Sequence, residues 1–232
     1  MTLSARDEHL LEIMDDPSCD ERRLQATYRR FGTVNRLISA WGTVYRTLLR
    51  PHLRSLGRPA RVLDLGSGGG DVVTRLAGLA ERDRLAVSWV GADPDPRAYA
   101  AARLRHAPGV EFRATDSTAL IAAGERFDAV ISNHVLHHLS PEGLRTFADD
   151  SRMLSSGPVL HSDIARGRLA YGLYAIGITP FAPGTFLRTD GLRSIRRSYR
   201  ADELAAALPD GWTVTRPAPF RLVATAEGLA DA

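Results

Sequence analysis

The chain contains no lysine, so its 30 basic side chains other than histidine are all arginines. Schiff-base chemistry, pyridoxal-phosphate chemistry and the Walker phosphate-binding motif each need a lysine, and the sequence therefore excludes those classes of site. Cysteine is almost absent as well, because Cys19 is the single one and cannot form a disulfide within the chain. A chain without disulfides suits a reducing compartment, so we expect a cytoplasmic protein.

Long apolar runs and metal-binding spacings are also missing. No run approaches the ~20 apolar residues of a membrane-spanning helix, and the N-terminus is charged at residues 6–8, where a signal peptide would be apolar. We therefore expect no stable membrane insertion. The histidines and the cysteine form no cluster with zinc-binding spacing, so we expect no metal ion.

Charge is unevenly distributed along the chain, although the formal net charge is only +3. Residues 22–61 carry ten arginines and no acid, whereas residues 7–21 carry seven acids and no arginine. A basic stretch can face nucleic acid, a membrane surface or an acidic partner, and it can equally be a solvated helix face; these alternatives stay open. No recognised RNA-binding motif accompanies it, so we expect no nucleic-acid partner.

Apolar strand patterns alternate with helical patterns along most of the chain. Strands are expected at 60–65, 86–92, 110–113, 127–132 and 158–164, and a closing pair at 211–215 and 220–224. This alternation predicts an α/β fold with a parallel, doubly wound sheet. Apolar residues recurring every three or four positions from Leu24 to Leu48 predict amphipathic helices, preceded by a weakly ordered lead-in over residues 1–20.

The segment from Arg61 to Asp71 combines a short strand, a glycine turn and the start of a helix. Its spacing is Asp-x-Gly-x-Gly-x-Gly, with glycines at 66, 68 and 70. Glycine lets the backbone approach a ligand closely, and the free N–H groups of the first helical turn point toward that ligand. The dinucleotide fingerprint needs a small residue where this chain has Asp71, so the pattern disfavours NAD or FAD.

With this turn, and with four further segments in the same order, the sequence resembles the class I S-adenosylmethionine-dependent methyltransferases over roughly residues 58–226. The resemblance implies a Rossmann-like, doubly wound sheet of seven strands in a domain over residues 58–232, with an N-terminal helical lid over residues 1–57 and a substrate-side insertion around residues 165–200. It also implies S-adenosylmethionine as methyl donor and S-adenosylhomocysteine as product.

By the same resemblance, the cofactor-binding residues are Asp64, Gly66, Ser67, Gly68, Gly70, Asp93, Pro94, Asp116, Ser117 and Asn133. Asp93 would bind the ribose hydroxyls and Pro94 would pack on the adenine. Asp116 would accept a hydrogen bond from the adenine amino group, with a helix-cap or turn role as the alternative. Asn133 would lie at the amino-acid end of the cofactor, beside the methyl group.

Methyl transfer to oxygen requires the acceptor to lose a proton, and histidine, with a pKa near 6.5, is a suitable general base. His134, His137 and His138 follow the fourth expected strand. The Leu-His-His-Leu segment at 136–139 resembles that of natural-product O-methyltransferases. These enzymes carry an acid just after the fifth strand, and Asp163 of this chain matches it and could orient an imidazole. The alternative, that these histidines are packing residues, stays open.

These observations predict an enzyme that methylates a small molecule, with a phenolic or enolic hydroxyl of a polyketide-like secondary metabolite as the expected acceptor, free or tethered to a carrier. One alternative is a carbon methyltransferase of the quinone-biosynthesis type, which the spacing of Phe31, Asn35 and Trp41 faintly resembles. Another is a cofactor-binding regulatory or RNA-associated module. A homodimer is compatible with the sequence.

Overall fold

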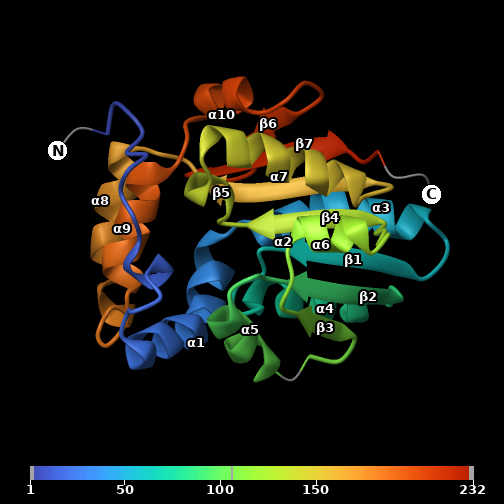
Figure 1. Ribbon diagram of the computed structural model, residues 1–232, viewed down its shortest axis with the longest axis horizontal. Coiled ribbons are helices and arrows are strands. Elements are labelled where there is room, and N and C mark those ends of the chain that lie inside the picture. The colour runs from blue at the N-terminus through green and yellow to red at the C-terminus, as the bar shows by residue number, and fades with distance from the viewer. Residues whose placement is uncertain (1–2, 106, 230–232) are drawn as a thin grey trace.

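A computed structural model describes residues 3–105 and 107–229 of the chain, and its centre is one seven-stranded sheet (Figure 1). The strands are β1 (Ala60–Leu65), β2 (Val87–Ala92), β3 (Val110–Arg113), β4 (Ala129–Asn133), β5 (Pro158–Ile164), β6 (Thr213–Thr215) and β7 (Arg221–Glu227). Their order across the sheet is β3-β2-β1-β4-β5-β7-β6. The first five are parallel, and β7 runs antiparallel to both β5 and β6. The doubly wound sheet predicted from the sequence is confirmed.

Helices cover both faces of this sheet. One face carries α2 (Trp41–Val44), α3 (Arg50–Ser55) and α4 (Asp71–Arg82), and the other carries α6 (Ser117–Ala122), α7 (Pro141–Met153) and α10 (Ala201–Ala207). Figure 1 shows α6 and α7 in front of the strands. Because β1 and β4 are buried on both faces, their sequences are almost continuously apolar, as expected for central parallel strands.

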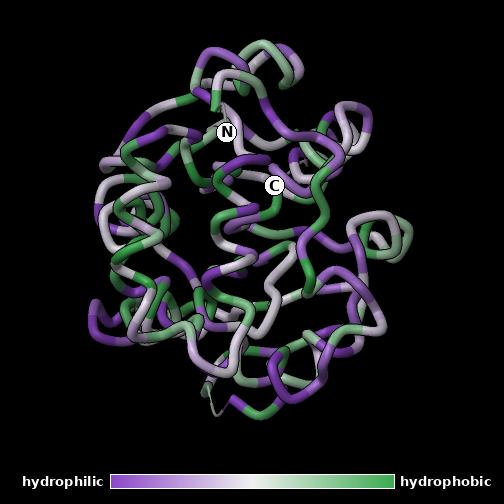
Figure 2. Tube along the Cα trace, turned by 90° about the vertical axis from the view of Figure 1, so that its left-hand side faces the viewer, coloured by the Kyte–Doolittle hydropathy of each residue, from purple (hydrophilic) through white to green (hydrophobic). Residues whose placement is uncertain are grey.

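Four further helices gather near the carboxyl ends of the parallel strands (Figure 1). They are α1 (Glu21–Ile38), α5 (Pro96–Arg103), α8 (Arg168–Gly177) and α9 (Leu187–Arg197), and single helical turns lie at Ile13–Asp15, Tyr45–Leu49, Leu136–His138 and Thr179–Phe181. Figure 2 views this end of the molecule, where hydrophilic and hydrophobic stretches alternate along the covering helices. Only part of the predicted lid, the segment up to the end of α1, lies in this layer, together with α5 and with the predicted insertion around residues 165–200, whereas α2 and α3 pack on a face of the sheet. The domain boundary between residues 57 and 58 remains a prediction.

The N-terminal segment differs from the weakly ordered lead-in predicted for residues 1–20, of which the first two lie outside the described residues. The Asp190 carboxylate on α9 accepts the main-chain N–H groups of Ile13 and Met14 at 2.9 and 3.0 Å. The Arg193 guanidinium donates to the carbonyl of Leu11 at 2.7 Å. That prediction was wrong. The segment has no helical or strand periodicity of its own, but its contacts with α9, almost 180 positions later in the chain, hold it in place.

No helix within the described parts of the chain is long and apolar enough to cross a membrane.

Candidate active site

A cavity of about 410 Å³ lies at the carboxyl ends of β1, β2 and β4, where residues of α1, α5 and α9 also line it. Open parallel sheets bind ligands at this edge. The predicted cofactor residues that line it are Asp64, Gly66, Ser67, Gly68, Asp93, Pro94 and Asn133, and the predicted catalytic residues that line it are His134 and His138. The structure thus brings nine of the predicted positions together around one space.

The glycine turn forms the floor of this cavity. Gly66 has a φ of +73°, and a Cβ placed on it would lie 2.7 Å from Cγ2 of Val135, so only glycine fits there. The N–H groups of Gly66 and Ser67 both donate to the carbonyl of Ala92, which ties the turn to the end of β2. Gly70 lies behind the turn and precedes α4, outside the residues that line the cavity.

Asp64, next to the last residue of β1, is a fully buried carboxylate. Neither of its oxygens accepts a hydrogen bond of normal geometry, although the main-chain N–H of Val73 lies close enough to favour its charged form. Burial raises its pKa well above the usual value, and the nearby carboxylates of Asp71 and Asp93 raise it further. An unpaired buried carboxylate is costly unless a cation neutralises it. S-adenosylmethionine carries an ammonium and a sulfonium, so this acidic part of the cavity fits the expected cofactor.

Asp93 follows β2 and holds the turn in place. Its Oδ2 accepts the N–H of Gly68 at 2.8 Å, and its Oδ1 accepts the N–H of Asp95 at 2.9 Å. Each carboxylate oxygen has a second lone pair, so Asp93 retains acceptor capacity for ribose hydroxyls. The exposed Pro94 ring follows it on the cavity wall.

Asn133 ends β4, and its side-chain oxygen, Oδ1, accepts two hydrogen bonds from other side chains. Trp41 Nε1 and Arg221 Nη2 both donate to this oxygen, each at 3.1 Å. The amide NH₂ of Asn133 is therefore the group left to donate into the cavity. The sequence analysis did not single out Arg221, the first residue of β7. An arginine directly before the apolar run Leu-Val-Ala was a signal that could have pointed to it.

Asp116 and Ser117 are placed differently from the other predicted cofactor residues. Asp116 is the N-cap of α6, where its Oδ1 accepts the N–H of Ala119 at 2.9 Å. The hydroxyl of Ser117 donates to Asp150 at 2.5 Å. Neither residue lines the cavity, so the helix-cap alternative describes the geometry of Asp116, and its adenine contact stays a prediction.

His137 is completely buried between two carboxylates. Its Nδ1 lies 2.7 Å from Asp163 Oδ1, and its Nε2 lies 3.3 Å from Glu12 Oε1. Burial alone would lower the pKa of His137, but Asp163 and Glu12 raise it to about 9. The imidazole is thus held as a cation, with Nδ1 hydrogen-bonded to Asp163 and Nε2 at ion-pair distance from Glu12, which suits it poorly to remove a proton from an acceptor.

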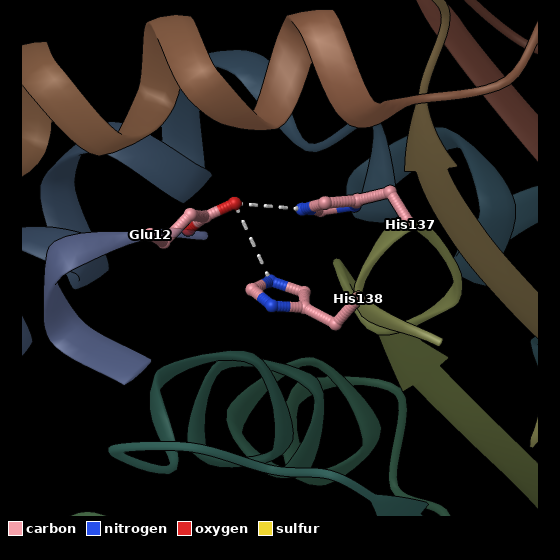
Figure 3. A group of neighbouring side chains, drawn as sticks. All are labelled: Glu12, His137 and His138. Carbon is pink, nitrogen blue, oxygen red and sulfur yellow. Dashed lines mark ion pairs between the residues drawn. The ribbon is translucent and has the colours of Figure 1, made fainter. Parts of the chain in front are cut away.

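His138 faces the cavity, with 28% of its side chain exposed. Its Nδ1 lies 3.2 Å from Asp15 Oδ2, and its Nε2 lies 3.6 Å from Glu12 Oε1. Figure 3 shows both histidine rings directed at the carboxylate of Glu12, which comes from the N-terminal segment. The sequence could not suggest Glu12, because 125 positions separate it from His137.

Glu12, His137 and His138 offer metal-ligand atoms within 4.8 Å of one another. A proton on His137 and the hydroxyl of Ser194, which donates to Glu12 at 2.7 Å, provide charge and hydrogen-bond partners for the buried carboxylate. The Glu12 carboxylate therefore has charge and hydrogen-bond partners without a metal ion. That the site binds no metal stays a prediction.

His134 lies where the cavity passes from the cofactor turn toward β7. Its φ is +62°, which is uncommon for a residue other than glycine and often marks a functional site. Its Nε2 accepts a hydrogen bond from Arg221 Nη1 at 2.6 Å. Burial and the Arg221 charge lower the pKa of His134 well below its usual value, so this imidazole is neutral with one nitrogen already occupied.

Comparison with known proteins finds similarity to methyltransferases. Residues 62–157 match a family model described as a methyltransferase domain. A ubiquinone biosynthesis O-methyltransferase of Brucella anthropi is 31% identical over 157 residues, an alignment that covers 65% of this chain and 58% of that protein. The protein of the same name from Brucella ovis is 33% identical over 120 residues, covering 50% and 46%. The chain thus spans about half the length of the curated relatives it matches.

Solved structures share the fold at low sequence identity. The plantazolicin methyltransferase BpumL, in complex with a monoazolic desmethyl analogue and S-adenosylhomocysteine, superimposes with a TM-score of 0.60 at 11% identity, covering 90% of this chain and 95% of that one. The CurJ carbon methyltransferase gives 0.63 at 16%, covering 91% and 61%. The chain thus resembles methyltransferases over residues 62–157 and in parts of its relatives, and it shares the fold of solved methyltransferase structures.

Proposed function

We propose that this protein transfers a methyl group from S-adenosylmethionine to a small-molecule acceptor. The observation that carries the proposal is Asp64, a fully buried carboxylate that accepts no hydrogen bond of normal geometry, beside a glycine turn at the carboxyl edge of the sheet. That arrangement suits a cofactor that is cationic and that approaches the backbone closely. Relatives and structural neighbours named as methyltransferases support it.

When bound, the cofactor would supply a methyl group on a sulfonium, and the sulfur would leave as a neutral thioether once the acceptor's lone pair took the carbon. The protein's main task is therefore alignment. Aligning donor and acceptor contributes up to about 7–11 kcal/mol in favourable cases. The glycine turn and Asp93 hold the nucleoside end, and Asp64 and Asn133 hold the amino-acid end.

The acceptor atom that we propose is a phenolic or enolic oxygen, as in a polyketide-like metabolite. Its proton must leave, and two of the three histidines after β4, His134 and His138, line the cavity with one ring nitrogen that no hydrogen bond occupies. Of these two, only His138 has a carboxylate rather than a guanidinium at its other ring nitrogen. Asp15 orients the ring through Nδ1. We therefore propose His138 as the general base, His137 and Asp163 as the buried pair that positions it, and His134 as a neutral cavity-lining group.

The second candidate is transfer to carbon. Trp41, one of the residues whose spacing resembles the quinone-type carbon methyltransferases, contacts Asn133 at the methyl end of the cavity, and a carbon methyltransferase shares the fold. An activated ring carbon would need no prior loss of a hydroxyl proton.

Methyl transfer from labelled S-adenosylmethionine to a panel of phenols, hydroxypyrones and quinols tests the proposal, with products identified by mass spectrometry and NMR. An O-methyl product supports the reaction proposed, whereas a C-methyl product replaces it with the second candidate. If S-adenosylhomocysteine fails to raise the melting temperature and no product forms, the methyltransferase proposal itself is wrong.

A further inference from the structure

A second cavity, of about 660 Å³, adjoins the first. Its walls come from the C-terminal end of α1, from α2 and α4, from α8 and from the chain just before β7. Four residues line both cavities: Val34, Ile38, Ile164 and Tyr174. A ligand that fills the second cavity would therefore reach the space in which the first one holds the methyl group.

The two cavities carry opposite charge. Seven carboxylates line the first, namely Glu12, Asp15, Asp64, Asp71, Asp93, Asp95 and Asp190, and no arginine among the described residues does so. Four arginines line the second, namely Arg36, Arg46, Arg75 and Arg221, and no described aspartate or glutamate does so. Adjacent cavities of opposite sign match a cationic donor beside an anionic acceptor.

Three of these guanidinium groups lie close to one another. A Cβ placed on Gly42 would lie 3.1 Å from Arg75 Nη2 and 3.6 Å from Arg46 Nη1. Burial lowers the pKa of Arg75, and the charges of Arg36 and Arg46 lower it further. Within the described part of the chain none of the three forms an ion pair with a carboxylate. The charge of Asp71 acts on Arg75 from beyond ion-pair distance and offsets part of their mutual repulsion.

The fourth arginine, Arg221, lies at the junction of the two cavities. Only 3% of it is exposed, and its two terminal nitrogens contact His134 and Asn133, which line the first cavity. Its Nε is buried without a partner, and no described carboxylate lies within ion-pair distance of it. The charge of Asp163 acts on Arg221 from beyond ion-pair distance, so the buried guanidinium is only partly compensated. An anion at this junction would stabilise it further.

The remainder of the second cavity is apolar. Several of its lining side chains are apolar yet exposed to solvent, including Leu37 at 69%, Leu173 at 53% and Phe220 at 39%. Exposed apolar side chains gathered around a cavity favour a ligand with an apolar body. The cavity thus combines the two properties expected of a site for an amphiphilic acid.

We propose that the second cavity binds the methyl acceptor, and that this acceptor is an apolar molecule carrying a carboxylate or another oxyanion. The inference rests on the proposed function and names its substrate class. The apolar body contacts α1 and α8, and the oxyanion binds the arginines, with Arg221 nearest to the cofactor. The arginine-rich stretch over residues 22–61 acquires a role, because Arg36 and Arg46 belong to it.

Calorimetric titration in the presence of saturating S-adenosylhomocysteine tests this, with three probes of equal chain length: decanoate, decanamide and decylamine. We expect decanoate to bind about tenfold more tightly than decanamide, since charged hydrogen bonds distinguish the two, and decylamine not to bind. Equal binding of decanoate and decanamide would overturn the proposal.

Three variants locate the binding site. Arg75→Gln and Arg221→Gln should each remove most of the preference for decanoate, whereas Arg145→Gln, on the exposed face of α7, should keep it. Arg75 is only half-buried on α4, whereas Arg221 is almost fully buried. The Arg75 variant therefore tests the site even if Arg221→Gln does not fold. A preference that survives in Arg75→Gln, or that is lost equally in Arg145→Gln, counts against the cavity.

The melting-temperature increase caused by S-adenosylhomocysteine separates this proposal from the function on which it rests. Stabilisation by S-adenosylhomocysteine without a preference for decanoate contradicts only the anionic acceptor. Loss of that stabilisation in the unmodified protein contradicts the methyltransferase function itself.

Discussion

Asp163 holds His137 through two of its own atoms. Oδ2 accepts the main-chain N–H of His137 at 2.9 Å, and Oδ1 lies 2.7 Å from Nδ1 of the ring. Both side chains are buried, and the nearby His137 charge lowers the pKa of Asp163 below its usual value despite burial. The end of β5 thereby fixes the turn after β4, and with it the direction of the neighbouring His138.

Replacing Asp163 with asparagine should strongly destabilise the protein. The variant leaves the His137 charge buried without its closer partner, and breaking a buried ion pair costs about 3–5 kcal/mol. Urea unfolding at neutral pH measures the change. Asp149→Asn, at an exposed position on α7, is the matched control and should change the free energy of unfolding by less than about 0.5 kcal/mol. A loss no larger than that of the control would show that the pair is not an ionic one.

Asp93→Ala should weaken binding of S-adenosylhomocysteine by at least about tenfold. The substitution removes the acceptor for the ribose and also the bond that holds the N–H of Gly68, and a charged hydrogen bond is worth about 1.5–3 kcal/mol. Calorimetric titration measures the affinity. Normal affinity in this variant would show that the cofactor placement is wrong.

Asp116→Ala separates the two roles considered for that carboxylate. Loss of an N-cap costs about 1 kcal/mol of stability, and that loss is expected because Asp116 caps α6. If Asp116 also contacts the adenine, the affinity for S-adenosylhomocysteine should fall together with the stability. Unchanged affinity would leave the helix cap as its whole role.

Affinity for S-adenosylhomocysteine should rise as the pH increases from about 5 toward 7. Burial, with Asp71 and Asp93, raises the pKa of Asp64 in the free protein, so the side chain is partly protonated at acidic pH. The ligand's ammonium favours the ionised carboxylate, and binding must therefore release a proton below the raised pKa. Titrations across this range should show a smaller pH dependence in Asp64→Asn. An equal dependence in both proteins would assign the proton to another group.

His161 should make the fold sensitive to acid. Burial lowers its pKa to about 3, its Nδ1 lies 2.8 Å from the hydroxyl of Ser132, and its ring stacks on Trp212. An unfolded chain binds a proton here near pH 6.5, whereas the folded chain does not until about pH 3. Between about pH 6.5 and pH 3, this residue alone should lower the free energy of unfolding by about 1.4 kcal/mol for each unit by which the pH falls.

Urea unfolding between about pH 7 and 4.5 measures that slope. In His161→Phe the number of protons taken up on unfolding should fall by about one, and the slope should fall with it, whatever the effect on absolute stability. The exposed control variant His9→Gln should keep the slope. Equal slopes in the protein and in His161→Phe would mean that His161 does not cause the loss in acid.

The central sheet could be predicted from the sequence because its signals are local. The apolar runs that become β1 and β5, and the helix from Pro141 behind its Ser140 cap, agree with the structure to within a residue or so. The helix α6 was not predicted, since six residues are too short for a periodicity to emerge. Its existence depends instead on capping by Asp116 and on packing against α7.

Seven of the ten predicted cofactor residues line one cavity, because these side chains lie at or just after the ends of β1, β2 and β4. Their contacts with the cofactor remain predictions. The acceptor half of the site could not be predicted in this way. Glu12 reaches the histidines from the opposite end of the chain, and Arg221 reaches Asn133 from a strand 88 positions later. Such contacts arise from the packing of the N-terminal segment on α9 and of β7 beside β5, and no spacing within the sequence encodes them.

His138→Gln should lower kcat by about 10²–10⁴, the usual contribution of a general base, with little change in affinity for S-adenosylhomocysteine. Its side chain faces the acceptor end of the cavity, while the glycine turn and Asp93 bind the other end. His137→Gln is the matched variant, since the two residues are adjacent and differ in exposure. We expect its main effect on stability, because it removes the cation between Asp163 and Glu12. A full kcat in His138→Gln with a true hydroxyl acceptor would remove the base role, and guanidinium binding of an already ionised acceptor at Arg221 would then account for the reaction without one.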